Sequence, residues 1–128
     1  MNNLELWALF ATTILAGLTI FQLALIAGAP LGEYAWGGKH KVLTPKLRVS
    51  SILSILLYVI FAWFALAKSG LIPGFQDDAT VSMAIWIFFG YFALGIFMNA
   101  ISRSKKERAV MTPVAALLAV AFFFLAIG

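Results

Sequence analysis

The only histidine in this chain of 128 residues, His40, lies shortly after the acidic residue Glu33. A carboxylate and an imidazole can exchange protons near neutral pH, so this pair is a candidate for acid–base chemistry. Structural zinc sites use four nitrogen or sulfur ligands. Because the chain contains no cysteine, one His and one Glu are too few for such a site. We therefore predict no metal, no cofactor and no enzymatic activity, with Glu33 and His40 as the basis of a catalytic alternative.

A glycine-rich turn, Trp36-Gly37-Gly38, lies between these two residues and is followed by further cations. Backbone N–H groups of the turn, beside lysine side chains, would form a concave site for a lipid phosphate. Alternatively, the turn allows its aromatic neighbours to anchor at a membrane interface. Both interpretations stay open, and Glu33 is expected to form an ion pair with a nearby lysine or with Arg48. The candidate ligand-binding residues of this stretch are Glu33, Tyr34, Trp36, Lys39, His40, Lys41 and Arg48.

Gln22 and Asn99 are the strongest polar residues inside the apolar parts of the chain. Together with Ser51 and Ser54 they would line one polar pocket, which adds Gln22, Ser51 and Asn99 to the candidate ligand-binding residues. The alternative is hydrogen bonding between helices, which contributes only about 0.6 kcal/mol on average in a membrane protein. The cores of the apolar segments contain no charged residue, which argues against a proton-coupled pump or a charge-lined channel.

Composition places these residues in a membrane. The chain is 63% hydrophobic and 11% charged, whereas soluble domains are about a quarter charged. Its length accommodates four membrane spans of about 20 residues each. We predict an all-α integral membrane protein with one transmembrane domain, a four-helix bundle built from two helical hairpins. The expected spans are residues 4–29, 48–68, 80–101 and 105–127, connected on one side by loops 30–47 and 102–108.

Two of these boundaries depend on proline. Pro30 disfavours helix at the preceding residue, so the first span is expected to end at Ala29. Two start signals compete for the last span: the capping box Ser104-x-x-Glu107, and Thr112-Pro113. A helix that began at Thr112 would be roughly 22 Å long, too short for a hydrocarbon core of about 30 Å. We therefore expect a helix from near Ser104 to the end, loosened at Pro113.

The positive charges predict the orientation. Of the nine lysines and arginines, eight lie in or directly beside the two connections on the same side of the expected bundle. The positive-inside rule places that side in the cytoplasm and both termini outside. The cations lie at the ends of apolar runs and not along a soluble face, so we expect contact with anionic lipid and no nucleic-acid partner. The eight residues are Lys39, Lys41, Lys46, Arg48, Arg103, Lys105, Lys106 and Arg108.

Three motifs resemble those of small four-span bacterial membrane proteins without an assigned function. They are Gly28-Ala29-Pro30-Leu31-Gly32, Trp36-Gly37-Gly38, and Leu43 through Leu47-Arg48; the likeness extends to residues 102–113. The resemblance implies a multi-pass protein of the bacterial cytoplasmic membrane and implies no activity. Val42-Leu43-Thr44-Pro45 also recurs as Val110-Met111-Thr112-Pro113. Whether this repeat reflects a duplication of the hairpin or only helix-start chemistry stays open.

Three functional hypotheses follow. The leading one is a non-enzymatic binding or scaffold module that engages anionic lipid head groups, or a membrane partner, through its basic loops. The second is a small transporter or channel for a small solute, assembled as a homodimer, with Gln22, Asn99 and the serines along the path. The third is a membrane-embedded enzyme that uses Glu33 and His40.

Overall fold

The computed structural model describes residues 1–128 and is entirely helical. Four long helices are joined by short connections, and two 3₁₀ turns interrupt the first connection. Each long helix is long and apolar enough to cross a membrane, as expected for a multi-pass membrane protein. The elements are α1 (Asn3–Ile26), η1 (Gly32–Tyr34), η2 (Trp36–Gly38), α2 (Pro45–Ser69), α3 (Ala79–Ala100) and α4 (Lys105–Ile127).

Each long helix begins at a side chain that accepts a hydrogen bond from a backbone N–H of the first turn. Asn2 accepts from Glu5 in α1, and Asp78 accepts from Thr80 and Val81 in α3. These bonds satisfy N–H groups that have no partner within the helix. In the same way Thr44 caps α2 and Ser104 caps α4.

Two helix boundaries differ from the expected ones. Helix α1 ends at Ile26 and not at Ala29, because Gly28 takes a left-handed conformation with φ of 95°. The N–H of Gly28 bonds to Leu25 O, and that of Ala29 bonds to Ala24 O, which is the Schellman arrangement. The helix thus ends three residues before Ala29, the position at which Pro30 would disfavour helix.

Helix α2 begins at Pro45 and not near Arg48. Thr44 caps it, and proline fits the first position, where the missing N–H costs nothing. The second Thr-Pro pair behaves differently, because Pro113 lies inside α4. The preference for a last helix that begins at Ser104 is therefore confirmed.

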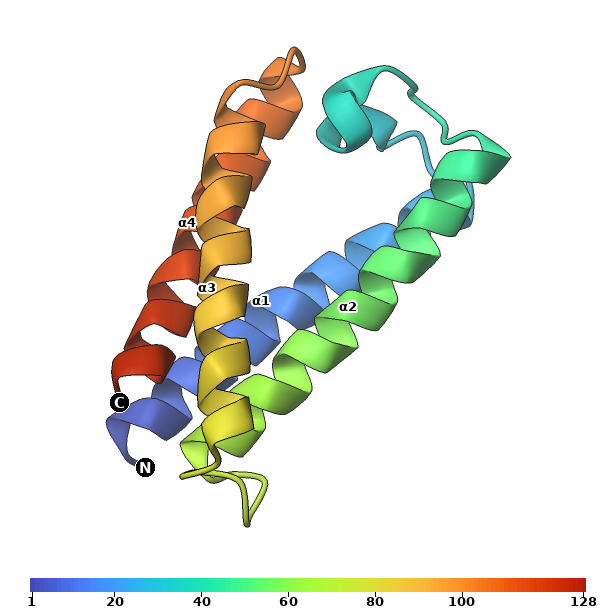
Figure 1. The fold of residues 1–128 in the computed structure, drawn as a ribbon. Coiled ribbons are helices and arrows are strands. Elements are labelled where there is room, and N and C mark those ends of the chain that lie inside the picture. Colours follow the sequence, from blue (N-terminus) through green and yellow to red (C-terminus); the bar gives the residue numbers. More distant parts are fainter.

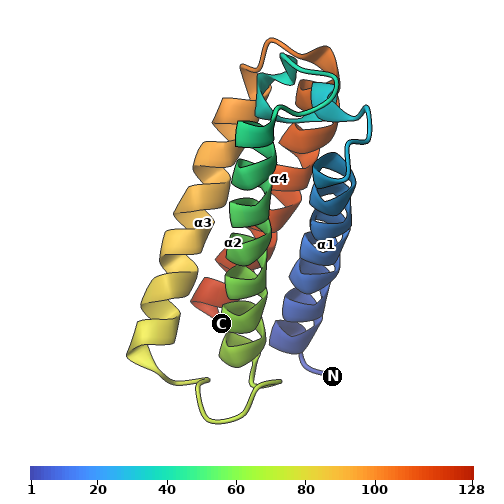
Figure 2. The same ribbon diagram turned by 90° about the vertical axis from the view of Figure 1, so that its right-hand side faces the viewer.

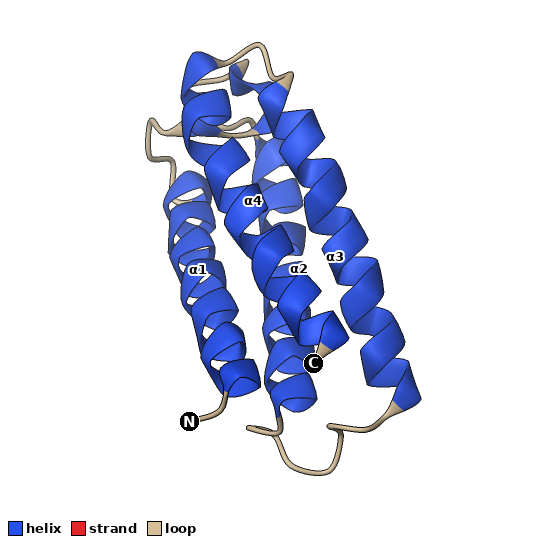
Figure 3. Cartoon of the chain, turned by 90° about the vertical axis from the view of Figure 1, so that its left-hand side faces the viewer, coloured by secondary structure: helices blue, strands red, loops and turns tan.

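The bundle consists of two hairpins, α1–α2 and α3–α4 (Figure 1). They lie close together at the end that carries both termini, and they diverge toward the end that carries η1 and η2. Views from opposite sides, each turned by 90° from Figure 1, show the helices running side by side, with connections at both ends (Figures 2 and 3). The predicted all-α four-helix bundle is confirmed.

The core is concentrated toward the terminal end. There Phe61 of α2 contacts the rings of Phe88, Phe92 and Phe122, at centroid distances of 4.7, 5.1 and 6.4 Å. Small residues from three helices surround these rings and let the backbones approach closely. Among the small residues that are almost fully buried are Ala8, Ala11, Ala65, Ala119 and Ala121.

The opposite end carries the eight cations identified above and is called the basic end below. It comprises the connections 27–44 and 101–104 with the adjoining helix turns. The terminal end carries Asp77 and Asp78, in the connection between α2 and α3. The two ends therefore differ in charge as well as in packing.

Candidate functional site

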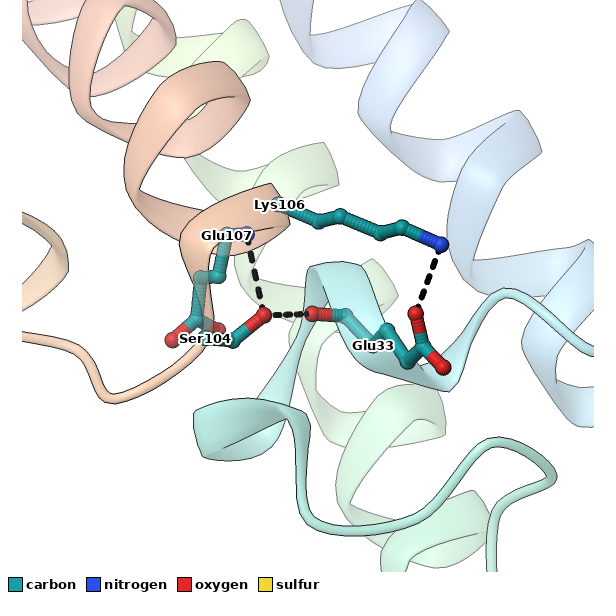
Figure 4. Close-up of polar contacts among 4 residues, drawn as sticks. All are labelled: Glu33, Ser104, Lys106 and Glu107. Atoms are coloured by element: carbon teal, nitrogen blue, oxygen red, sulfur yellow. Dashed lines mark hydrogen bonds and ion pairs between the residues drawn. The ribbon is translucent and has the colours of Figure 1, made fainter.

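Residues 31–38, called the lid below, lie across the basic end and bind the first turn of α4 (Figure 4). Lys106 Nζ lies 2.6 Å from Glu33 Oε2, and the Ser104 hydroxyl donates a hydrogen bond to the Glu33 carbonyl. Gly38 packs so closely on Ser104 that a Cβ at this position would collide with the serine side chain. The lid belongs to the connection between α1 and α2. These contacts attach it to the other hairpin, α3–α4.

The backbone of the lid is unusual at three consecutive residues. Trp36, Gly37 and Gly38 have φ values of 53°, 78° and 71°. For tryptophan this left-handed conformation is unfavourable by about 1–2 kcal/mol, so other contacts must hold it. One such contact is the hydrogen bond from Trp36 Nε1 to the Ser51 hydroxyl, at 3.3 Å. The indole therefore connects the lid to α2.

The turn at Gly37 and Gly38 contacts a carboxylate of the protein itself, that of Glu107. Gly37 N–H donates to Glu107 Oε2 at 3.4 Å, and Gly38 N–H donates to Ala35 O at 2.9 Å. Both N–H groups are thus occupied, and the expected concave site for a lipid phosphate is not free. Residues far apart in the sequence make this contact, which local spacing cannot predict.

The capping box at the start of α4 is only half formed. Ser104 Oγ accepts a hydrogen bond from Glu107 N–H, as expected. The Glu107 carboxylate bonds to the lid instead of returning to Ser104 N–H, which donates to Ser102 Oγ. Glu107 is only 8% exposed. The sequence predicts that Glu107 caps the start of α4, whereas in the structure its carboxylate is buried and bonded to the lid.

A cavity of about 670 Å³ lies beneath the lid, between the two hairpins. It reaches from Glu107 to Leu118, roughly 16 Å along α4 at 1.5 Å per residue. Cavities of roughly 300–1,000 Å³ are typical of small-molecule sites. Most of its lining is hydrophobic, and the polar lining residues include Gln22, Tyr34, Ser54, Tyr58, Asn99 and Glu107.

Gln22 is the most informative of these residues. It is 5% exposed, and its amide Nε2 donates to the Tyr58 hydroxyl at 3.3 Å. Its Oε1 is buried and has no hydrogen-bond partner. An unpartnered buried acceptor costs about 1–3 kcal/mol, so such atoms are rare and require an explanation. Thr12 and Thr112 also have buried hydroxyl oxygens without partners, but neither residue lines the cavity.

The structure brings some of the sequence candidates together. Gln22, Asn99, Tyr34 and Trp36 all line the cavity, and Ser54 joins them. Asn99 Nδ2 donates to Gly95 O, one helical turn earlier. These four candidates come from α1, α3 and the lid.

Other candidates lie outside the cavity. Ser51 is fully buried against Trp36, and Arg48 Nε donates to Leu43 O. Lys39 and Lys41 are exposed on the outer surface. Glu33 is bound to Lys106, and not to one of the cations expected from the sequence.

Glu33 and His40 form no hydrogen bond with each other, and Glu33 is occupied elsewhere. The hydrogen bond from Lys106 lowers the pKa of the Glu33 carboxyl, and the positive charges of Lys106 and Lys41 lower it further. A carboxylate with a lowered pKa is a weaker base. No group of three or more His, Asp or Glu side chains is arranged to hold a metal ion.

Several residues of the cavity are not among the candidates from the sequence, including the polar residues Glu107, Tyr58 and Arg103. In the sequence, Glu107 and Arg103 belong to a basic connection, and Tyr58 is a single hydroxyl in an apolar helix. The sequence contains one signal for Glu107. A carboxylate in the first turn of a membrane helix usually faces the bundle interior or a cavity and not lipid. Comparisons of the chain with protein-family models, with curated proteins and with solved structures found no match.

Proposed function

We propose that this protein is a non-enzymatic binding module whose basic end engages anionic lipid head groups. The supporting observation is that only one of the eight cations at the basic end, Lys106, forms an ion pair. Lys39, Lys41, Lys46, Arg103 and Lys105 are exposed and form no ion pair. Each cation near an anionic surface contributes about 1 kcal/mol of attraction.

The attached lid adds to this charge pattern. Lys39 follows Gly38 directly and Lys41 comes after His40, while Lys105 follows the Ser104 cap against which Gly38 packs. Gly32 N–H is also bonded to Lys41 O at 2.8 Å. Cations from both connections are thus presented as one surface. Consistent with the positive-inside rule, we place this surface in the cytoplasm and the protein in the bacterial cytoplasmic membrane.

The test is to change Lys39, Lys41, Lys46 and Lys105 together to Gln and to measure the lipids that co-purify with the protein. None of these side chains makes an ion pair, so we expect the fold to remain intact. We expect the share of phosphatidylglycerol to fall while that of uncharged lipids does not. The matched control changes the same four residues to Arg and should retain phosphatidylglycerol. An unchanged share in the Gln variant would contradict the proposal.

The cavity favours a second candidate function, transport of a small solute by a homodimer. Gln22, Ser54 and Asn99 would supply hydrogen bonds along a path that begins at the basic end. The aromatic core at the terminal end would have to open for a solute to pass. A flux assay in proteoliposomes tests this candidate: Gln22→Leu and Asn99→Leu should each abolish flux, and the absence of flux in the unmodified protein rejects it.

A further inference from the structure

We propose that the cavity beneath the lid binds the head group of a membrane phospholipid that carries a primary ammonium, with its acyl chains leaving between α2 and α3. This site differs from the proposed anionic-lipid surface in place and in chemistry. It lies inside the bundle, and it selects hydrogen-bond donors instead of net negative charge.

The donors of the cavity are largely used within the protein. The amide nitrogen of Gln22 bonds to Tyr58, that of Asn99 bonds to Gly95 O, and the Ser54 hydroxyl donates to Ser50 O. The two polar lining side chains that are almost fully buried, Gln22 and Glu107, retain acceptors that are free or weakly used. Gln22 Oε1 is buried without a partner, and the nearly buried Glu107 carboxylate accepts only a long bond from Gly37.

A primary ammonium complements this lining, because it has several N–H donors and no acceptor. Its charge is opposite to that of Glu107, and charge-assisted hydrogen bonds are roughly twice as strong as neutral ones. The remaining donors fit the rest of a phospholipid. Arg103 is an exposed cation on the cavity lining and suits the phosphate, while the Tyr58 hydroxyl can still donate its proton to an ester carbonyl.

The cavity is open on the side where acyl chains would lie. Tyr91, Leu94 and Met98 of α3 line the cavity and are also 50%, 61% and 55% exposed. Because these residues line the cavity and also lie on the outer surface of α3, they mark a lateral opening of the cavity toward lipid. Toward the basic end the backbones of the two hairpins diverge (Figure 1). Phe92 and Leu118 are buried lining residues that close the cavity toward the aromatic core.

The experiment uses Trp36, the only tryptophan that lines the cavity. Changing Trp7, Trp63 and Trp86 to Phe leaves its fluorescence as the single reporter. The protein is reconstituted in phosphatidylcholine vesicles that contain a minor lipid with brominated acyl chains, which quench tryptophan on contact. The minor lipids are phosphatidylethanolamine, its N-methyl and N,N-dimethyl derivatives, phosphatidylcholine and phosphatidylglycerol, all with the same chains.

We expect quenching to fall along the methylation series, since each methyl group removes one N–H donor and leaves the zwitterionic charge unchanged. Phosphatidylglycerol carries no ammonium, so its quenching should stay below that of phosphatidylethanolamine. Equal quenching by all the lipids would mean non-selective contact and would overturn the proposal. Strongest quenching by phosphatidylglycerol would assign Trp36 to the anionic-lipid surface and would overturn it as well.

Variants of the lining give an independent measurement. Gln22→Leu removes the unpartnered acceptor at similar volume, and Glu107→Gln removes the charge while keeping an acceptor for Gly37. In each we expect about a tenfold loss of the preference for phosphatidylethanolamine over phosphatidylcholine. Thr12→Val is the matched control, because it removes a buried unpartnered hydroxyl outside the cavity. A preserved preference in both lining variants would reject the site.

The two lipid proposals fail separately. The four-lysine variant should lose phosphatidylglycerol and keep its preference for phosphatidylethanolamine. The two lining variants should keep phosphatidylglycerol and lose their preference for phosphatidylethanolamine. If the four-lysine variant also loses the preference for phosphatidylethanolamine, the cavity is not a separate site and this proposal is wrong.

Discussion

The terminal half and the basic half of this bundle are built from similar apolar helices but are filled in different ways. In the terminal half, small alanines allow the helices to approach and Phe61, Phe92 and Phe122 fill the centre. In the basic half the hairpins diverge (Figure 1), and a connecting segment, the lid, covers the cavity of about 670 Å³ between them. The comparison shows that one bundle combines a packed core in its terminal half with a cavity in its basic half.

The largest expected effect is on the packed half. Phe122 is fully buried among the rings of α2 and α3, so Phe122→Ala should lower the free energy of unfolding by about 3–5 kcal/mol. The matched control is Phe97→Ala, because Phe97 is 60% exposed on the outer face of α3. It should change the free energy by less than about 0.5 kcal/mol. Unfolding in mixed micelles with increasing denaturing detergent measures both, and similar losses would contradict the packing contrast.

An intermediate effect is expected at the lid. Gly37 and Gly38 both have positive φ, so alanine at either position costs about 1 kcal/mol of backbone strain. Only at Gly38 would the added Cβ also collide with Ser104, which should cost about 1–3 kcal/mol more. Gly38→Ala should therefore release the lid, and Gly37→Ala should not. Trypsin cleavage after Lys39 and Lys41 in detergent compares the two, and equal rates would argue against attachment of the lid at Ser104.

The smallest effect concerns pH. Because Lys106 lowers the pKa of Glu33 below its ordinary value of 4.5, the ionised carboxylate stabilises the attached lid at neutral pH. This contribution is fully present above the ordinary value and is lost as the pH falls through the lowered pKa. The effect is small, because the Glu33 side chain is 39% exposed.

Fluorescence of the variant that retains only Trp36 can follow this transition as the pH is lowered. Glu33→Gln serves as the control, since it removes the titrating group but keeps the side-chain length. The difference between the two curves should be confined to acid pH. Coincident curves would show that the ion pair contributes nothing to the position of the lid.

The number of helices and their apolar character follow from the sequence, because a membrane span has a fixed length and leaves a run of apolar residues. The starts of α2 and α4 depend on local capping, yet only the second was predicted well. For α2 the decisive local signal is Thr44-Pro45, with threonine as the cap and proline in the first turn. For α1 the decisive residue was Gly28, whose left-handed conformation ends the helix before Pro30.

The candidate site was predictable only in part. Gln22 and Asn99 stood out as polar residues in apolar helices, and both line the cavity. The contact between Gly37 and Glu107 did not stand out, because it joins segments that are distant in the sequence. For the same reason a turn that looked like a free anion site is occupied by the protein's own carboxylate.

The most direct test of the contrast between the two halves uses single cysteines, because the chain contains none. Ala115 and Ala119 lie one turn apart on α4 and are 7% and 4% exposed. Ala115 lines the cavity, whereas Ala119 belongs to the packed core. With a small water-soluble thiol reagent, Ala115→Cys should react in the folded protein and Ala119→Cys only after unfolding. Protection of both cysteines, or equal reaction of both, would contradict an open basic half above a closed terminal half.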